Sequence, residues 1–277
     1  MLLKWITALS AVLAVLRCMT IGLTALPMLW HFVFHFAAYF GVLALAAFVF
    51  FAVACALVDT SKPQGPDNPF YRQLMYLYSE AGITLSGIRL KTVGLEKTPK
   101  EGRFLLVCNH QNESDPPILT HCFKQCHPVF ISKRENIDYP LLGKVMHKTG
   151  CQMINRENDR EALKTILNCI QILKNDQASI FGFPEGGILG DYKLYHFRSG
   201  MLKIAQKANV PIVVCTLRGT ADFFRNLKRL KPTPVELHLL DVIPAEELKG
   251  KTTVEIGDRI YEMMIADLGE EWRLPKE

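Results

Sequence analysis

The stretch FLLVCNHQNESDPPIL, residues 104–119, sets the pattern of this chain: an apolar run, a polar turn and a second apolar run. Residues 104–107 are uniformly apolar, as expected for a buried strand. The prolines at 116 and 117 favour the first turn of a helix, for which Asp115 is the predicted N-cap. A strand that passes through a short turn into a helix is the repeating unit of an α/β fold.

The same alternation of strands and helices continues along the chain from residue 88. The predicted strands lie at residues 88–93, 104–107, 128–132, 151–154, 179–183, 210–217 and 236–242. The predicted helices or helical turns lie at residues 116–124, 140–150, 158–173, 200–208 and 253–268. We therefore expect an α/β fold with a largely parallel sheet flanked by helices.

The helix that starts at Asn158 has the clearest amphipathic pattern of the set. One predicted apolar face contains Leu163, Ile166, Leu167, Ile170 and Leu173. Asn158 and Glu161 have the spacing of a capping box, with asparagine in place of the usual serine or threonine. This pattern predicts a helix that packs its leucines and isoleucines against the sheet.

The first 58 residues differ from the rest because Lys4 and Arg17 are their only formally charged side chains. Residues 36–58 are uncharged and long enough to cross a bilayer, since about 20 apolar residues span the hydrocarbon core. An earlier apolar stretch, residues 5–30, contains Arg17 near its middle and Pro27 near its end. We predict an N-terminal two-helix membrane hairpin at residues 1–58.

The first helix of this hairpin has two possible positions. It spans the membrane with a kink, or it lies in one leaflet with Arg17 reaching the interface. The connection near residues 29–32 carries no Lys or Arg, whereas Lys4, Lys62 and Arg72 flank the hairpin. This distribution predicts a protein of the cell membrane with its catalytic domain facing the cytoplasm.

A cleavable signal peptide is the alternative interpretation of the N-terminus. Lys4 would then be its basic region and residues 6–16 its apolar core. The apolar sequence continues to Val58, however, and no small-residue cleavage site is followed by a polar segment. An uncleaved anchor explains the pattern better.

The remaining chain divides at two composition changes. Residues 59–68, DTSKPQGPDN, have the composition of a linker. Residues 69–83 have apolar side chains at helical spacing, which suits either a helix on the membrane surface or a helix packed on the next domain. We therefore expect a hairpin at 1–58, a linker and membrane-proximal helix at 59–87, and an α/β domain at 88–277.

The bulk composition narrows the chemistry. The 277 residues carry a formal net charge of +5 and eight cysteines, whose spacing does not indicate a disulfide framework. The stretch HCFKQCH, residues 121–127, has no second ligand pair at zinc-like spacing. We expect free thiols, no metal site, no bound cofactor and no nucleic-acid partner.

His110 and Asp115 are the candidate catalytic pair. They are five residues apart across a strand-to-helix turn, so the carboxylate can fold back onto the imidazole. A histidine oriented by a carboxylate is a typical general base near neutral pH. The chain has no G-x-S-x-G, phosphate-loop or H-E-x-x-H motif, so the pair would activate a hydroxyl group of the substrate itself. On this motif alone, a capped turn with a surface histidine is the structural alternative.

Further stretches follow the histidine motif in a specific order. They are FISKRENIDYPLLG (130–143), GCQMINR (150–156), FPEGG (183–187), FRSG (197–200) and VPIV (210–213). Together with NHQNESD (109–115) they resemble the sequence blocks of the 1-acylglycerol-3-phosphate (lysophosphatidate) acyltransferases, whose signature is N-H-x-x-x-x-D. Five further blocks in the right order are a specific signal.

This resemblance implies transfer of a fatty acyl group from a thioester, acyl-CoA or acyl-carrier protein, to the sn-2 hydroxyl of lysophosphatidate. The product is phosphatidic acid for phospholipid synthesis. His110 would take the hydroxyl proton while Asp115 fixes the imidazole tautomer. Arg156 corresponds to the family's phosphate-side arginine, and Glu185 and Gly186 would line the acceptor pocket.

One departure from the family pattern concerns the acceptor. The family block reads F-P-E-G-T-R, but here Gly187 and Ile188 replace the threonine and the arginine. Lys193 and Arg198 are the downstream candidates to bind the phosphate instead. Otherwise the acceptor is another lysolipid or a non-phosphorylated alcohol. A membrane-anchored thioester or phosphoester hydrolase and a non-catalytic scaffold are the hypotheses from other classes.

Overall fold

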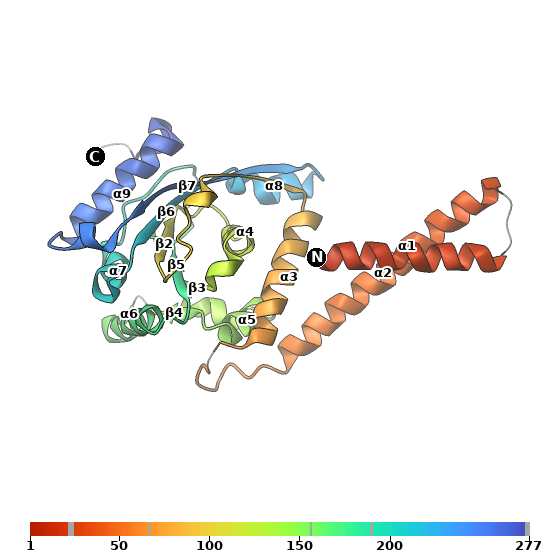
Figure 1. Ribbon diagram of the computed structural model, residues 1–277, viewed down its shortest axis with the longest axis horizontal. Coiled ribbons are helices and arrows are strands. Elements are labelled where there is room, and N and C mark those ends of the chain that lie inside the picture. The colour runs from red at the N-terminus through yellow and green to blue at the C-terminus, as the bar shows by residue number, and fades with distance from the viewer. Residues whose placement is uncertain (22–24, 66, 156, 189–190, 275–277) are drawn as a thin grey trace.

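The chain folds into an α/β unit from which two long helices project (Figure 1). The structure, a computed structural model, describes residues 1–21, 25–65, 67–155, 157–188 and 191–274. The projecting helices are α1 (Leu2–Ile21) and α2 (Ala25–Ala56). Helix α3 (Pro69–Leu85) lies between this pair and the sheet.

The described strands form one seven-stranded sheet in the order β1-β7-β6-β2-β5-β3-β4. They are β1 (Ile88–Val93), β2 (Leu105–Cys108), β3 (Pro128–Lys133), β4 (Gln152–Ile154), β5 (Ser179–Gly182), β6 (Ile212–Arg218) and β7 (Thr233–Ile243). Neighbouring strands are parallel except β6 and β7, which are antiparallel. The predicted, largely parallel sheet is therefore confirmed. The carboxyl ends of β2, β3, β5 and β6 meet along one edge, where sheets of this kind bind ligands.

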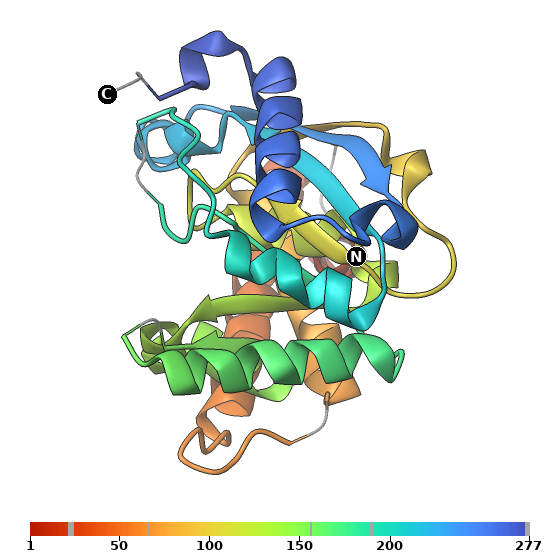
Figure 2. The same ribbon diagram turned by 90° about the vertical axis from the view of Figure 1, so that its left-hand side faces the viewer.

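Helices cover both faces of the sheet. Helices α6 (Asp159–Lys174), α7 (Lys203–Ala208) and α9 (Thr253–Leu268) lie on one face (Figure 2). On the other face lie α3, α4 (Asp115–Cys122) and α5 (Leu142–Lys148). The short helix α8 (Phe223–Lys228) lies between β6 and β7 in the sequence, and β7 pairs with the edge strand β1.

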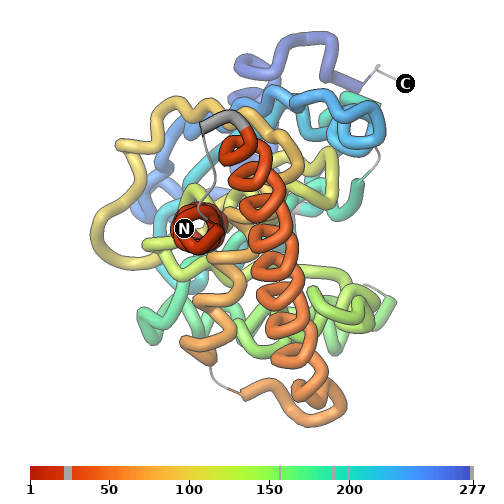
Figure 3. Tube along the Cα trace, turned by 90° about the vertical axis from the view of Figure 1, so that its right-hand side faces the viewer, coloured from red at the N-terminus to blue at the C-terminus, as the bar shows by residue number. Residues whose placement is uncertain are grey.

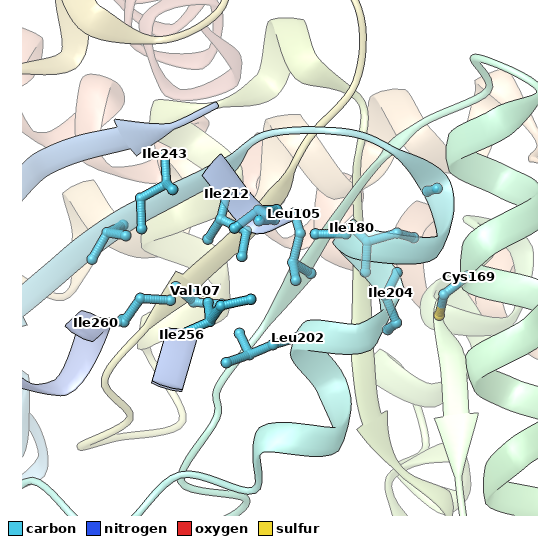
Figure 4. Packing of buried hydrophobic residues seen from close by; sticks show 14 of the residues in the cluster. Leu105, Val107, Cys169, Ile180, Leu202, Ile204, Ile212, Ile243, Ile256 and Ile260 are labelled. Atoms are coloured by element: carbon cyan, nitrogen blue, oxygen red, sulfur yellow. The ribbon is translucent and has the colours of Figure 1, made fainter. Parts of the chain in front are cut away.

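Each face of the sheet has its own hydrophobic core. Along β2, Leu105 and Val107 join the cluster beneath α6, α7 and α9, while Leu106 and Cys108 join the opposite cluster. This alternation follows from the two-residue period of a strand, and a strand buried on both faces is apolar throughout. Figure 4 shows the first cluster, in which Ile180 and Ile212 of the sheet pack with Ile204 of α7.

The connection between the two N-terminal helices lies earlier than the sequence indicated. Helix α2 begins at Ala25 and continues past Trp30, so the predicted connection at residues 29–32 was wrong. Pro27 lies in the first turn of α2, where a proline needs no intrahelical N–H bond and does not break the helix. Arg17 therefore belongs to the last part of α1 and not to the middle of a longer segment.

The two helices pack on each other as a hairpin, seen from its own side in Figure 3. The buried side chains of α1 recur every four residues, at Ile6, Ser10, Ala14 and Cys18, so they share one face. By length and composition alone, α1 and residues 27–56 of α2 are each sufficient to cross a membrane. These helices are consistent with membrane association.

Helix α3 contacts both the hairpin and the α/β unit, so the predicted packing on the next domain is confirmed, while its position relative to a membrane stays a prediction. The Tyr71 hydroxyl donates to the Ala54 carbonyl at 2.8 Å. The ring of Tyr78 stacks on Phe51 with centroids 4.2 Å apart. On its other side, α3 packs against α4 and α5. The helix thus fixes the hairpin relative to the helical layer that carries the polar turn.

The predicted apolar face of α6 was partly wrong. Leu163 and Leu167 are exposed, and the helix instead buries Thr165, Cys169, Ile170 and Leu173. The small side chains of this buried stripe allow a close approach to β4, where the Thr165 hydroxyl donates to a strand carbonyl at 2.8 Å. The helix is therefore rotated toward its smaller residues.

The start of α6 contains only half of the predicted capping box. Asn158 is the N-cap, and its side chain accepts from the backbone N–H groups of Arg160 and Glu161. The Glu161 carboxylate accepts a hydrogen bond from the side chain of Asn155 at 3.0 Å. The preceding loop thus binds the carboxylate that a full box would use.

Candidate active site

The polar turn begins with an asparagine that joins two strands. The Asn109 side-chain amide donates to the Leu217 carbonyl at 2.9 Å, and the Leu217 N–H donates to the Asn109 side-chain oxygen at 2.7 Å. Asn109 is fully buried. These two bonds fix the start of the turn against the end of β6, so this asparagine has a positioning role that the sequence did not reveal.

His110 and Asp115 lie in direct contact, as predicted from their spacing. His110 Nδ1 is 2.8 Å from Asp115 Oδ2, and the Asp115 side chain is completely buried. The backbone N–H groups of Gln111 and Asn112 donate to the same oxygen at 2.8 and 2.9 Å. Because the carboxylate accepts from Nδ1–H, the Nε2 lone pair is the basic site of the imidazole.

The N-cap prediction for Asp115 was wrong, because its side chain contacts His110. Helix α4 starts at Asp115 itself, with Ser114 in the N-cap position. The Asp115 side chain turns back toward His110 and the turn, and does not cap the helix. The Asp115 side chain thus orients the histidine instead of capping helix α4.

Two residues of the FPEGG block hold the histidine from the loop that follows β5. The ring of Phe183 stacks on His110 with centroids 3.9 Å apart and an angle of 14°. The His110 backbone N–H donates to Glu185 Oε1 at 2.6 Å, and the Tyr195 N–H donates to Glu185 Oε2 at 3.1 Å. Glu185 positions the turn, since both of its carboxylate oxygens accept from backbone N–H groups.

The burial of Glu185 has an electrostatic consequence. Only 8% of the residue is exposed, and burial raises the pKa of its carboxyl from 4.5 to about 7. The two N–H groups that donate to it lower this pKa in part, and the nearby Asp115 carboxylate raises it further. The site therefore holds a carboxyl group that titrates near neutral pH.

We expect this raised pKa to make the folded protein less stable as the pH rises from about 5 to about 8. The folded chain binds the Glu185 proton more tightly than the unfolded chain, so stability present at low pH is lost through the folded pKa. The measurement is the difference in melting temperature, in detergent, between wild type and Glu185→Gln. As the pH rises, the wild type should lose stability relative to the variant. Glu113→Gln, an exposed change in the same turn, is the control. A gap that does not change with pH would contradict the prediction.

The glycines after Glu185 form a tight turn beside β3. Gly186 has φ of +82°, a backbone conformation that favours glycine, and its N–H donates to the Phe183 carbonyl at 3.1 Å. A methyl group at Gly187 would lie 3.9 Å from Lys133 Nζ. Lys133 is exposed at the end of β3, within a block quoted above but not singled out there. The structure thus adds a cation next to the position of the missing threonine.

The other predicted binding residues lie in different places. Arg156 is outside the described residues. The Arg198 side chain is exposed, and its backbone N–H donates to the Pro184 carbonyl at 2.8 Å. The Lys193 ammonium donates to the Glu271 carbonyl at 2.6 Å, in the C-terminal segment. The structure therefore brings together His110 and Asp115 with the glutamate and glycine turn, and it engages Lys193 elsewhere.

An apolar cavity of about 430 Å³ lies beside the catalytic turn. Its lining includes Glu113 and Ser114 from the turn, Phe51 of α2 and Tyr78 of α3. The cavity thus extends from Glu113 and Ser114 of the turn to Phe51 of the hairpin. A space of this kind suits an alkyl chain better than a polar metabolite.

The described residues contain no cluster of three or more His, Cys, Asp or Glu side chains able to hold a metal ion. All eight cysteines are free thiols. In the HCFKQCH stretch, α4 ends at Cys122 and a single helical turn ends at Cys126. The stretch is the end of a helix followed by a turn.

Comparison with known proteins gives consistent matches over this region. Residues 89–218 match the model of the family described as Acyltransferase. A Mycoplasma pneumoniae protein named "Probable 1-acyl-sn-glycerol-3-phosphate acyltransferase" is 31% identical over 202 residues, which cover 70% of this chain and 75% of that protein. The 1-acyl-sn-glycerol-3-phosphate acyltransferase alpha of Ovis aries is 26% identical over 243 residues, covering 87% and 83%.

A solved structure has the same fold. The 1-acyl-sn-glycerophosphate acyltransferase PlsC of Thermotoga maritima superposes with a TM-score of 0.60 at 21% identity, covering 74% of this chain and 81% of that one. The fold, the His–Asp turn and these matches define an acyltransferase. The chain belongs to the 1-acyl-sn-glycerol-3-phosphate acyltransferase family, which confirms the resemblance found in its sequence.

Proposed function

We propose that this protein transfers a fatty acyl group from an acyl thioester to the sn-2 hydroxyl of 1-acylglycerol-3-phosphate and thereby makes phosphatidic acid. The observation that carries the proposal is the buried Asp115 carboxylate on His110 Nδ1, which leaves Nε2 as a base in a turn whose Glu113 and Ser114 line an apolar cavity. The names of the relatives supply the substrate class. The acyl donor is acyl-CoA or acyl-carrier protein, used as a co-substrate.

In the proposed reaction, His110 Nε2 accepts the proton of the acceptor hydroxyl while its oxygen attacks the thioester carbonyl carbon. The carbon–sulfur bond then breaks, and the imidazolium returns the proton to the departing thiolate. Asp115 stabilises the imidazolium, because its carboxylate faces Nδ1–H at 2.8 Å. Glu185 and Phe183 hold the imidazole in place during both proton transfers.

The apolar cavity supports a lipid substrate. Its walls combine Phe51 and Tyr78, which belong to α2 and α3, with residues of the catalytic turn. A chain that enters from the hairpin side would reach the turn without crossing water. The cavity therefore fits the acyl chain of a membrane-borne acceptor or the chain being transferred.

We propose that Lys133 helps to bind the acceptor phosphate, where the family's arginine is replaced by Ile188. The Lys133 side chain is exposed at the end of β3, and its ammonium lies beside Gly187. Arg156 would supply the second cation by its resemblance to the family's phosphate-side arginine. A phosphate in a partly desolvated site needs such cations to offset its desolvation.

Lys133→Gln is expected to raise the KM for lysophosphatidate by about 10- to 100-fold, the effect of losing a charge-assisted hydrogen bond. The effect on monoacylglycerol, a neutral acceptor, should be much smaller. Purified protein with radiolabelled acyl-CoA or acyl-carrier protein and a panel of lysolipids, monoacylglycerol and glycerol 3-phosphate provides the measurement. Arg134→Gln, a neighbouring exposed cation, is the matched control.

The same panel tests the proposed function itself. Preferential acylation of lysophosphatidate supports it. Wild-type activity confined to another lysolipid or a neutral alcohol would reassign the acceptor, an alternative that Gly187 and Ile188 favour. Thioester hydrolysis without any acceptor would identify a hydrolase. If Lys133→Gln lost the same fraction of activity with phosphorylated and with neutral acceptors, this lysine would have a structural role and would not bind the phosphate.

We further propose that α1 and α2 anchor the protein in the cell membrane with the α/β unit in the cytoplasm. Exposed apolar side chains along both helices support the anchor. The flanking charges that support the orientation are Lys4 and Lys62, because Arg72 is buried in the α/β unit. Carbonate extraction should leave the protein in the membrane fraction. Release into the soluble fraction would contradict an integral anchor.

A further inference from the structure

The segment FFRNLKRLK, residues 223–231, forms α8 and the turn that leads to β7. Its exposed side chains combine two classes that seldom cluster on a soluble surface. Phe224, Leu227 and Leu230 are the exposed apolar members. The exposed basic members are Arg225, Lys228, Arg229 and Lys231. We call these seven side chains the α8 patch.

The backbone holds the most exposed member of the patch in place. Leu230 has φ of +51°, a conformation that favours glycine, and 93% of the residue is exposed. The Leu230 N–H donates to the Leu227 carbonyl at 3.1 Å, and the Lys231 N–H donates to the Asn226 carbonyl at 2.9 Å. These bonds close the C-terminus of α8 with a left-handed residue, and this cap holds the Leu230 side chain outward beside Phe224 and Leu227 in the exposed patch.

The α8 patch lies on the hairpin side of the molecule. The Thr233 N–H, just after the patch, donates to the carbonyl of Gly87 at 3.0 Å, two residues beyond the end of α3. Phe223 and Phe224 also line the apolar cavity together with Phe51 of α2. Figure 1 shows α8 near the C-terminal end of α3, where the hairpin meets the α/β unit.

We propose that the α8 patch binds the anionic surface of the membrane that holds the hairpin. The proposal rests on the membrane position of α1 and α2, from which the location of the patch follows. Apolar side chains among lysines and arginines are the composition that inserts shallowly into an anionic lipid surface. Asp222, the acidic residue just before α8, pairs with Arg225 at 2.6 Å.

This second contact would set the orientation of the active site relative to the membrane. Helix α3 fixes the α/β unit to the hairpin, so the tilt of this whole body relative to the membrane depends on what else contacts the lipid surface. A contact at α8, on the far end of α3 from the linker between α2 and α3, would hold the mouth of the apolar cavity at the lipid surface. Each cation near an anionic surface contributes a factor of about five in affinity, and salt weakens this attraction.

Hydrogen exchange of the full-length protein in lipid nanodiscs tests the proposal. Discs of phosphatidylcholine alone are compared with discs that also contain phosphatidylglycerol. Co-purification with the neutral discs checks the hairpin anchor separately. We expect amides of residues 223–231 to exchange roughly ten-fold more slowly in the anionic discs, and high salt to remove this protection.

Two variants separate the patch from net charge and from folding. The quadruple change Arg225→Gln, Lys228→Gln, Arg229→Gln and Lys231→Gln should abolish the lipid-dependent protection. The matched control changes Lys203, Lys207, Lys249 and Lys251 to glutamine, because these exposed lysines lie around α7, away from the hairpin. Melting temperatures in detergent check that both variants fold.

Three outcomes would overturn the proposal. The first is equal exchange of residues 223–231 in neutral and anionic discs. The second is loss of protection in the control variant to the same extent as in the patch variant. The third is protection that appears only on addition of acyl-carrier protein to neutral discs, which would identify an acidic protein as the partner of the patch.

Discussion

His110→Ala is expected to lower the rate of acyl transfer by about 10²- to 10⁴-fold, the usual contribution of a general base. The reason is geometric: Nε2 is the basic site of an imidazole whose other nitrogen is bound by Asp115 at 2.8 Å. Alanine removes the imidazole, the group in the turn that Asp115 orients to accept the hydroxyl proton. The measurement is the initial rate of phosphatidic acid formation by purified protein.

The companion change Asp115→Asn separates orientation from proton transfer. The amide oxygen of asparagine can take the place of the Asp115 oxygen that accepts these bonds, but it carries no negative charge to stabilise the imidazolium. Its NH2 group would occupy the buried position of Oδ1, which has no partner among the described residues. We expect a large loss of activity with the imidazole present. His121→Ala, on the same helix, is the control. A wild-type rate in His110→Ala would refute the catalytic assignment.

Arg72→Ala is expected to lower the free energy of unfolding by about 3 to 5 kcal/mol, the range for breaking a buried charged interaction. Only 4% of Arg72 is exposed. Its Nη1 donates to the Pro128 carbonyl and its Nη2 to the Thr149 carbonyl, both at 2.7 Å. Alanine would leave two buried carbonyl oxygens without partners where α3 joins the α/β unit.

The ion pair of Arg72 with Asp67 contributes less than these carbonyl contacts. Nε is 2.9 Å from the carboxylate, but the Asp67 side chain is 39% exposed, so solvent screens the pair. Asp67→Ala should therefore cost about 1 kcal/mol or less. Arg89→Ala, an exposed arginine, is the control and should stay within about 0.5 kcal/mol of wild type. Urea unfolding in detergent measures all three variants, and equal stability of Arg72→Ala and wild type would contradict the prediction.

The sequence predicted the elements whose causes are local. The contact of His110 with Asp115 follows from a five-residue spacing across a turn, and the apolar run of β2 follows from burial on both faces. Helix α9 (Thr253–Leu268) starts and ends at the predicted residues. These features need only the neighbouring residues.

Features that depend on distant residues escaped prediction. Asn109 binds Leu217 across 108 positions, and Glu185 binds the His110 N–H across 75 positions. No periodicity reports such pairs. Helix α8 was missed because it is six residues long and buries no side chain, so it lacks the apolar period of a core helix. Lys133 gained a proposed role only when the sheet placed it beside Gly187.

The hairpin boundary was missed for a different reason. Pro27 was taken as a sign of interruption, although a proline in the first turn of a helix removes no hydrogen bond. The rotation of α6 likewise depends on how closely Thr165 and Cys169 approach the sheet. An apolar pattern alone predicts that Leu163 and Leu167 of α6 are buried and that Thr165 is exposed, which is the reverse of what the structure shows.

The most direct test of the central claim follows the label of radiolabelled acyl-CoA or acyl-carrier protein on purified protein, with and without lysophosphatidate. Direct attack by the acceptor hydroxyl, with His110 as base, predicts phosphatidic acid and free thiol in equal amounts when lysophosphatidate is present. Without the acceptor, it predicts no thiol release and no label on the protein. Labelled protein, or thiol release that does not require the acceptor, would contradict this mechanism.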